Sequence, residues 1–135
     1  MGARIDLLAL PILAGVLLVA CGAGGDAEAG ERLYTSLTIG RADAPGCVTC
    51  HSLEPGEIKV GPSHAGVARR ATEVIQQSNY TGSATTAEGY LRESILVPDA
   101  YVEAGFAPGV MYQAYSQTLT EGELADLVAY LLTLE

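Results

Sequence analysis

The clearest hydrophobic pattern in this chain lies at its C-terminal end. Thr120 followed by Glu123 has the spacing of a capping box, which predicts the start of a helix. Beyond it, apolar residues recur at the three- and four-residue intervals of one helix face: Leu124, Leu127, Val128, Leu131 and Leu132. Such a stripe needs a partner to pack against. The candidate partner is a helix over 26–36. Helical spacing gives it one face made of Gly30, Leu33, Tyr34 and Leu37.

The rest of the pattern also predicts helices and loops. We expect a helix over 65–77 and another opened by a capping box at Thr85-Thr86-Ala87-Glu88, which runs through Leu96 and stops at Pro98. A short helical turn is expected around 47–52. Glycine and proline mark the loops 38–46, 53–62 and 99–119. The sequence thus predicts one small all-α domain.

The N-terminal segment predicts export. The apolar run Leu7 to Ala20 is shorter than the roughly 20 residues of a membrane-spanning helix, and suits a signal peptide over 1–20. It ends at Leu18-Val19-Ala20-Cys21-Gly22, which resembles the lipobox of bacterial lipoproteins. That resemblance implies cleavage before Cys21 and a lipid anchor on this cysteine, with 21–26 as lipidated residue and flexible tether. The alternative is an uncleaved N-terminal anchor with an incidental cysteine.

The net charge limits the kinds of partner that this protein can bind. The chain has 7 basic and 16 acidic residues and a net charge of −9. Such a surface repels nucleic acid and anionic lipid. We therefore expect no nucleic-acid partner, and a lipid rather than charge to hold the protein at a membrane.

The segment Cys47-Val48-Thr49-Cys50-His51 carries the candidate chemistry. A C-x-x-C-H sequence indicates attachment of a c-type haem, in which both thiols bond to the porphyrin and His51 ligates the iron. The alternatives are a dithiol redox pair and a zinc site that also draws on His64. Three cysteines would leave an odd thiol in an exported protein, but haem on Cys47 and Cys50 and lipid on Cys21 leave none over.

The C-x-x-C-H segment and the two terminal helices follow one another in the order that is typical of a known family. In this order, residues 27–135 resemble the class I c-type cytochromes. That family has a glycine four residues before an aromatic in its first helix, as Gly30 and Tyr34 stand here. Its last helix has a leucine-type residue three before an aromatic, as Leu127 and Tyr130 do. The resemblance implies one covalent haem c and two crossing terminal helices beside it.

The resemblance also implies the remaining site residues. A methionine in the loop before the last helix is the usual sixth ligand, and here it is Met111; the family often has proline directly after it, where this chain has Tyr112. The carbonyl of Pro62 would accept a hydrogen bond from the proximal imidazole. His64 is expected in a partly exposed loop on the proximal side. Candidate partners for the haem propionates are Arg92, Tyr90 and Tyr101.

Two filled axial positions suit one-electron transfer without a small-molecule substrate, and the sequence contains no catalytic constellation beside the haem motif. The expected function is electron transfer, not catalysis, at the outer face of a bacterial cytoplasmic membrane. The run Tyr90 to Tyr101 resembles haem subunits of respiratory complexes, among them the mono-haem lipoprotein subunit of alternative complex III. Partners would be subunits of such respiratory or photosynthetic complexes, or other redox proteins. The alternative is a haem enzyme or gas sensor with an open or labile sixth position.

Overall fold

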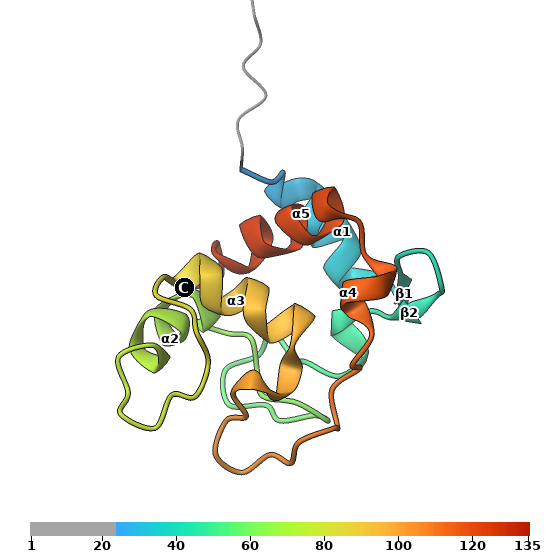
Figure 1. Ribbon diagram of the computed structural model, residues 1–135. Helices are drawn as coiled ribbons and strands as arrows, with labels where there is room; N and C mark the ends of the chain where they lie inside the picture. The colour runs from blue at the N-terminus through green and yellow to red at the C-terminus, as the bar shows by residue number, and fades with distance from the viewer. Residues whose placement is uncertain (1–23) are drawn as a thin grey trace, which may run out of the picture.

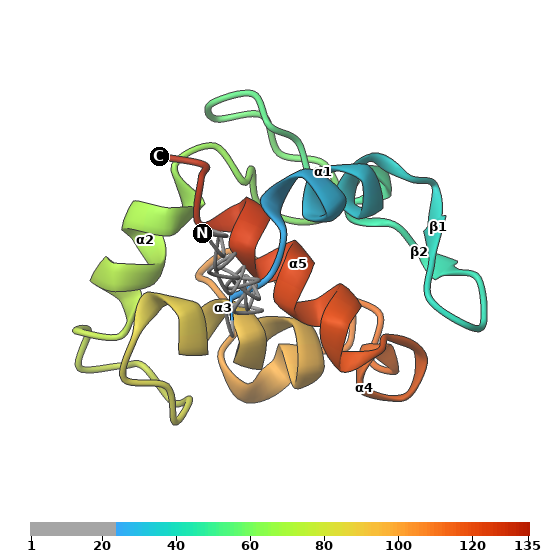
Figure 2. The same cartoon turned by 90° about the horizontal axis from the view of Figure 1, so that it is seen from above.

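The two helices at the ends of the fold cross each other. The computed structural model describes residues 24–135, so the expected signal peptide and Cys21 lie outside the described residues. Helix α1 (Ala27–Thr35) lies across α5 (Glu121–Leu131), as Figures 1 and 2 show from two directions. Asp26 caps α1 by accepting from the backbone N–H groups of Glu28 and Ala29, and its own N–H donates to Asp126 Oδ1 at 2.7 Å.

Gly30 is the reason that the two helices approach so closely. A Cβ atom at this position would lie 1.9 Å from the backbone oxygen of Asp126 and 2.7 Å from Cβ of Tyr130. Four residues on, the ring of Tyr34 packs on the ring of Tyr130, with 5.3 Å between the centroids. The predicted crossing of the terminal helices is therefore confirmed, as is the all-α fold class.

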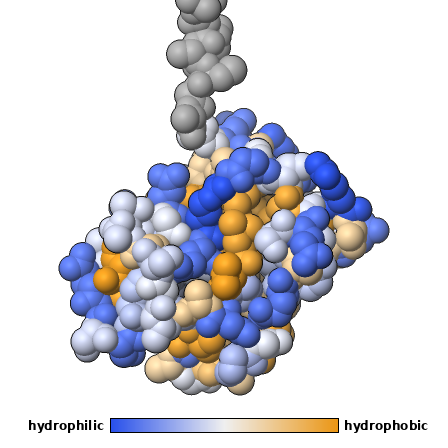
Figure 3. Space-filling model, viewed as in Figure 1, coloured by the Kyte–Doolittle hydropathy of each residue, from blue (hydrophilic) through white to orange (hydrophobic). Residues whose placement is uncertain are grey.

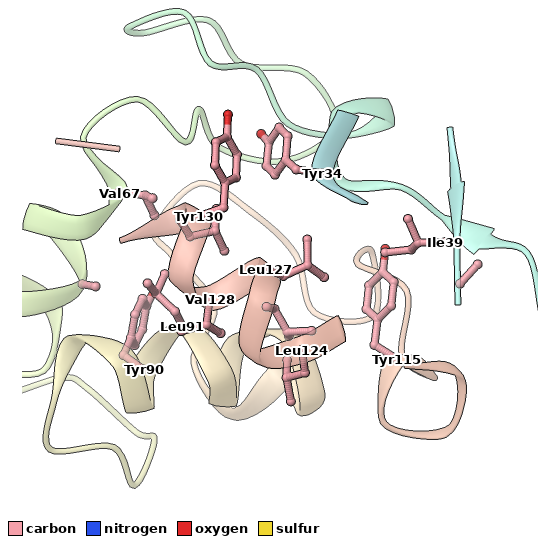
Figure 4. Close-up of a cluster of buried hydrophobic side chains, with 14 of the residues drawn as sticks. Tyr34, Ile39, Val67, Tyr90, Leu91, Tyr115, Leu124, Leu127, Val128 and Tyr130 are labelled. Atoms are coloured by element: carbon pink, nitrogen blue, oxygen red, sulfur yellow. The ribbon is translucent and has the colours of Figure 1, made fainter. Parts of the chain in front are cut away.

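The predicted stripe of α5 forms the centre of the core. Thr120 and Glu123 form the full capping box, each side chain accepting from the other's backbone N–H. Leu124 and Leu127 are almost completely buried. In Figure 4 they lie between α3 (Ala87–Leu96), which contributes Tyr90 and Leu91, and Tyr34 from α1.

Helix α2 (Val67–Val74) packs against α3 and is joined to the C-terminal end of the chain. Its residue Ala68 donates its N–H to the carbonyl of Leu134. The predicted helix 65–77 is shorter in the structure. Gly66 has a φ of 67°, and this left-handed conformation keeps residues 65 and 66 outside the helix.

Some details of the sequence prediction were wrong. The cap of α3 is Thr86, which accepts from the N–H of Gly89, because the helix begins one residue later than the predicted capping box required. Leu37 is 75% exposed, because α1 ends at Thr35 and its helical periodicity does not extend that far. The predicted loop 38–46 contains a small hairpin of β1 (Thr38–Ile39) and β2 (Ala44–Pro45).

The long loop predicted over 99–119 is partly helical. A 3-10 turn, η2 (Pro98–Ala100), follows α3 directly, and the short α4 (Tyr115–Thr118) precedes α5. Tyr115 holds α4 in place because its hydroxyl donates to the carbonyl of Pro45 in the hairpin. This contact joins residues far apart in the chain, which is why local sequence signals did not predict it.

Two loops form one end of the molecule. The loop before α2 carries the exposed side chains of Ile58 and Val60, and the loop before α4 carries Val110. Figure 3 shows apolar side chains gathered at the lower edge, where Figure 1 draws these loops. Within residues 24–135, none of the helices has the length and apolar character needed to cross a membrane.

Candidate functional site

A single cavity brings the predicted site residues together. Its walls are formed by α3, by the end of α5 and by the loops before α2 and α4. The empty volume between these walls, which includes the part that is open to solvent, is about 1170 Å³. The predicted haem-site residues all line it: Cys47, Cys50, His51, Pro62 and Met111. Residues that are distant in sequence thus face one common space.

A tight turn directs both cysteines into the cavity. The 3-10 helix η1 (Cys47–Thr49) is closed by N–H groups of Cys50 and His51, which donate to the carbonyl of Cys47 at 3.1 and 2.9 Å. Gly46 leads into it against the end of α1, and a Cβ here would lie 1.8 Å from the carbonyl oxygen of Ser36. The short turn predicted over 47–52 thus covers three residues in the structure.

The His51 imidazole is buried and has a defined tautomer. Its Nδ1–H donates to the carbonyl of Pro62 at 2.8 Å, which leaves Nε2 as the nitrogen with a free lone pair. Burial lowers the pKa of His51, and the bond to Pro62 opposes this in part. The ring is therefore suited to bind a metal as neutral imidazole. Gly61 lies directly beside it, since a Cβ there would be 2.5 Å from His51 Cε1.

A second histidine lies against the first. The rings of His51 and His64 are stacked, with 3.9 Å between centroids and 18° between planes. His64 is half-buried and is on the same side of the cavity as His51, where the sequence analysis expected it; the stacking was not foreseen. Burial holds the pKa of His64 well below its usual value, and the neighbouring His51 and Arg70 lower it further.

Met111 is positioned by a hydrogen-bonded loop. The Asp99 carboxylate, in the 3-10 turn η2, accepts from the N–H of Gly109 at 2.9 Å and from Nε2 of Gln113 at 3.3 Å. The same amide of Gln113 donates to the carbonyl of Met111 at 2.9 Å. Gly109 has a φ of 75°, which favours glycine. Asp99 therefore joins the two sides of the loop around the methionine.

Of the predicted propionate partners, the tyrosines reach the cavity and the arginine does not. Tyr90 and Tyr101 line it, and burial raises the pKa of Tyr90 to about 12. Arg92 points elsewhere and pairs with Glu121 of α5. The cationic side chain that does line the cavity is Arg70, which sequence reasoning missed. In the helical segment Arg69-Arg70, nothing in the sequence marks which arginine faces inward.

The chemistry of the cavity fits a covalent haem better than the alternatives. Apolar and aromatic walls surround two thiols, an imidazole and a thioether, which are the donors that such a cofactor uses. A dithiol redox pair works through a thiolate, but burial raises the pKa of Cys47 to about 11, which disfavours a thiolate at this position. A zinc site needs three or four ligands together, and residues 24–135 contain no suitable group of three His, Cys, Asp or Glu.

Comparison with known proteins agrees with the geometry. The family model described as Cytochrome c matches residues 27–135, which is most of the chain. A comparison with curated proteins returned no match. The C-x-x-C-H segment, the cavity around it and the crossing of α1 and α5 all lie within the matched residues. The chain therefore belongs to the cytochrome c family, whose cofactor is a covalently bound haem c and whose chemistry is haem-based electron transfer.

Proposed function

We propose that this protein transfers single electrons through one haem c that is ligated by His51 and Met111. The observation that carries the proposal is that both side chains line the cavity into which Cys47 and Cys50 point, although they come from loops far apart in the chain. When bound, the haem supplies an iron that alternates between its ferrous and ferric states. The protein's residues hold the ligands and control access to them.

The two proposed ligands, His51 and Met111, are held in place by different contacts. The bond from His51 Nδ1–H to Pro62 presents Nε2 to the metal and makes the imidazole more electron-rich. The thioether of Met111 is a soft ligand that favours ferrous iron and raises the reduction potential. The loop that carries it is joined through Asp99 to the 3-10 turn η2. An iron that both side chains ligate would have no open position for a substrate, which favours electron transfer through the haem edge.

Visible and near-infrared spectra of the haem-loaded protein test this ligation. We expect a c-type pyridine haemochrome and a low-spin spectrum with a methionine–iron charge-transfer band. Met111→Ala should lose that band, while Val110→Ala, which changes the neighbouring residue of the same loop, should keep it. A high-spin wild-type spectrum, or carbon monoxide binding without denaturation, would instead support a haem enzyme or gas sensor. A protein that takes up no haem would contradict both functions.

We also propose that a lipid on Cys21 holds the domain at the outer face of a bacterial cytoplasmic membrane. There it would act as a subunit of, or a carrier between, respiratory or photosynthetic complexes. The support is the lipobox-like sequence, which ends shortly before the first described helix at Ala27. The net charge of −9 argues for basic or apolar contacts on the partner.

Fractionation of the full-length chain tests the anchor. Wild-type protein should sediment with membranes and carry acyl chains by mass spectrometry. Cys21→Ser should remove the acyl chains and release the domain from the membrane. Retention of an uncleaved Cys21→Ser chain in the membrane would show that the N-terminal apolar segment is itself the anchor.

A further inference from the structure

The His64 ring lies against His51, the proposed iron ligand, but no hydrogen bond of the His64 side chain in the described part of the chain accounts for a histidine at this position. Its Nδ1 is buried and has no hydrogen-bond partner among the residues of 24–135. Leaving such an atom unpaired is unfavourable, because on burial it loses the hydrogen bond that water would make. A leucine would fill a similar volume without that cost. What the imidazole provides here, and leucine would not, is a flat face parallel to the ring of His51.

Hydrogen bonds hold the backbone on both sides of His64. Its backbone N–H donates to the carbonyl of Ser52 at 2.7 Å, and its own carbonyl accepts from Val67 at the start of α2. The Arg70 guanidinium donates to the carbonyls of both residues beside His64, namely Ser63 and Ala65. The anchored backbone, together with the ring contact to His51, limits how far the His64 ring can move.

A second ring and a glycine complete the surroundings. Tyr34 of α1 lies against His64 with 5.7 Å between ring centroids and 53° between planes. Gly61 lies beside the His51 ring, where a Cβ would approach Nδ1 to 2.9 Å and Cε1 to 2.5 Å. The hydrogen bond to Pro62 holds one edge of the His51 ring but leaves it free to tilt, because carbonyl acceptors tolerate a broad range of directions. A flat neighbour in face contact restricts that tilt.

We propose that His64 is a positioning residue, whose ring stacks on His51 and fixes the orientation of the proximal imidazole plane at the iron. This inference rests on the proposed ligation of the iron by His51. When a haem is bound, the plane of the imidazole that ligates it would influence the distribution of the unpaired electron of ferric iron, and residues around a metal ligand set the orientation of that ligand. His64 therefore acts on the electronic structure of the centre without touching the metal.

Proton NMR of the haem-loaded protein tests the proposal. In the ferric state, the hyperfine shifts of the haem methyl groups report the orientation of the iron ligands, the plane of the imidazole among them. His64→Leu should change the order or spacing of these resonances, whereas His64→Phe, which keeps a flat ring, should retain the wild-type pattern. Tyr34→Phe is the matched control, because it keeps the ring beside His64, and it should also retain the pattern. In the diamagnetic ferrous state, cross-relaxation between ring protons of His51 and His64 should be observed.

Stability separates a positioning role from a merely structural one. His64→Leu removes an unpaired buried nitrogen and should therefore unfold at the same or higher denaturant concentration than wild type. If His64→Leu does not fold, His64→Met supplies the second variant without a flat ring. An unchanged methyl pattern in the folded variant, or an equal change in His64→Phe, would overturn the proposal. Failure of His51 ligation would be recognised separately, from a high-spin spectrum of the wild-type protein.

Discussion

Gly30 is a point of direct backbone contact between α1 and α5. The space that its missing side chain leaves is filled by the carbonyl group of Asp126, so a Cβ would collide with backbone, which cannot move aside as a flexible side chain can. The neighbouring Tyr34 is completely buried beside this contact. A single atom at position 30 would therefore push the two helices apart along their whole packed length.

We predict that Gly30→Ala destabilises the haem-loaded protein by on the order of 3 kcal/mol, at the upper end of the usual cost of overpacking. Gly122→Ala is the matched control, because it also places alanine in a helix but its Cβ would meet nothing within 4 Å. That control should be neutral or stabilising by about 0.5 kcal/mol, since alanine is the better helix former. Denaturant unfolding monitored by circular dichroism measures both. Equal stabilities of the two variants would contradict the close contact.

At the scale of the element, the loop before α4 depends on contacts outside itself. No regular hydrogen-bond ladder holds the segment around Met111. Its position depends on the Asp99 carboxylate of η2 and on the Gln113 side chain. Such a loop has lower local stability than the helical core, so a methionine carried on it can leave a metal without global unfolding.

We predict that Asp99→Ala increases the population of protein with Met111 detached. The loss of its hydrogen bonds should cost about 1 kcal/mol, which corresponds to a roughly fivefold rise in that population. Asp99→Asn keeps an acceptor oxygen and should lie between the variant and wild type. The temperature at which the methionine–iron band disappears measures the effect. A band that persists equally in all three proteins would show that the hydrogen bonds of Asp99 do not hold Met111 in place.

The start of α5 links the stability of the fold to pH. The backbone N–H and then the hydroxyl of Thr120 hold the pKa of Glu123 below its usual value. Because the folded pKa is lower than the unfolded one, this stabilisation is complete above the ordinary glutamate pKa. It is lost as the pH falls through the lowered value.

We therefore predict that Glu123→Gln is less stable than wild type at neutral pH, and that the difference shrinks in acid. Unfolding curves recorded for both proteins from pH 7 into the acid range measure it. A stability difference that stays constant with pH would mean that the ionised carboxylate contributes nothing to the cap.

At the scale of the whole molecule, the excess of acidic residues determines which partners approach readily. With 16 acidic and 7 basic residues, the protein attracts cations over a distance set by the salt concentration. Apolar side chains at one end, among them Ile58, Val60 and Val110, give a contact area that does not depend on charge. Long-range attraction and close contact thus come from different residues.

We predict that small cationic redox reagents exchange electrons with this protein faster than anionic ones of similar potential at low salt. The rate ratio should fall by roughly tenfold or more as the salt concentration rises to 1 M, because charge attraction is then screened. Stopped-flow spectroscopy of the haem band gives both rates. A ratio near one that does not change with salt would show that the net charge does not act at the haem edge.

Much of this protein could be predicted from the sequence, because the signals are local. The capping box at Thr120, the stripe of α5 and the C-x-x-C-H segment are each contained in a few consecutive residues, and the structure shows both helical features and places the segment at a tight turn. Gly30 and Tyr34 indicated the helix crossing once they were considered in order with the other motifs. Haem attachment follows from the residue types and spacing of the C-x-x-C-H segment, so the family and its cofactor could be recognised without the structure.

Tertiary structure decided which side chains meet. Arg70 rather than Arg92 lines the cavity, Asp99 clamps the loop of Met111, and His64 stacks on His51. Each of these depends on bringing together segments that the sequence separates, or on which face of a helix turns inward, and no short pattern records either. A few consecutive residues therefore determine that this chain holds a haem, because the C-x-x-C-H segment is local, whereas the packing of loops and helices determines how the candidate ligands His51 and Met111 are held.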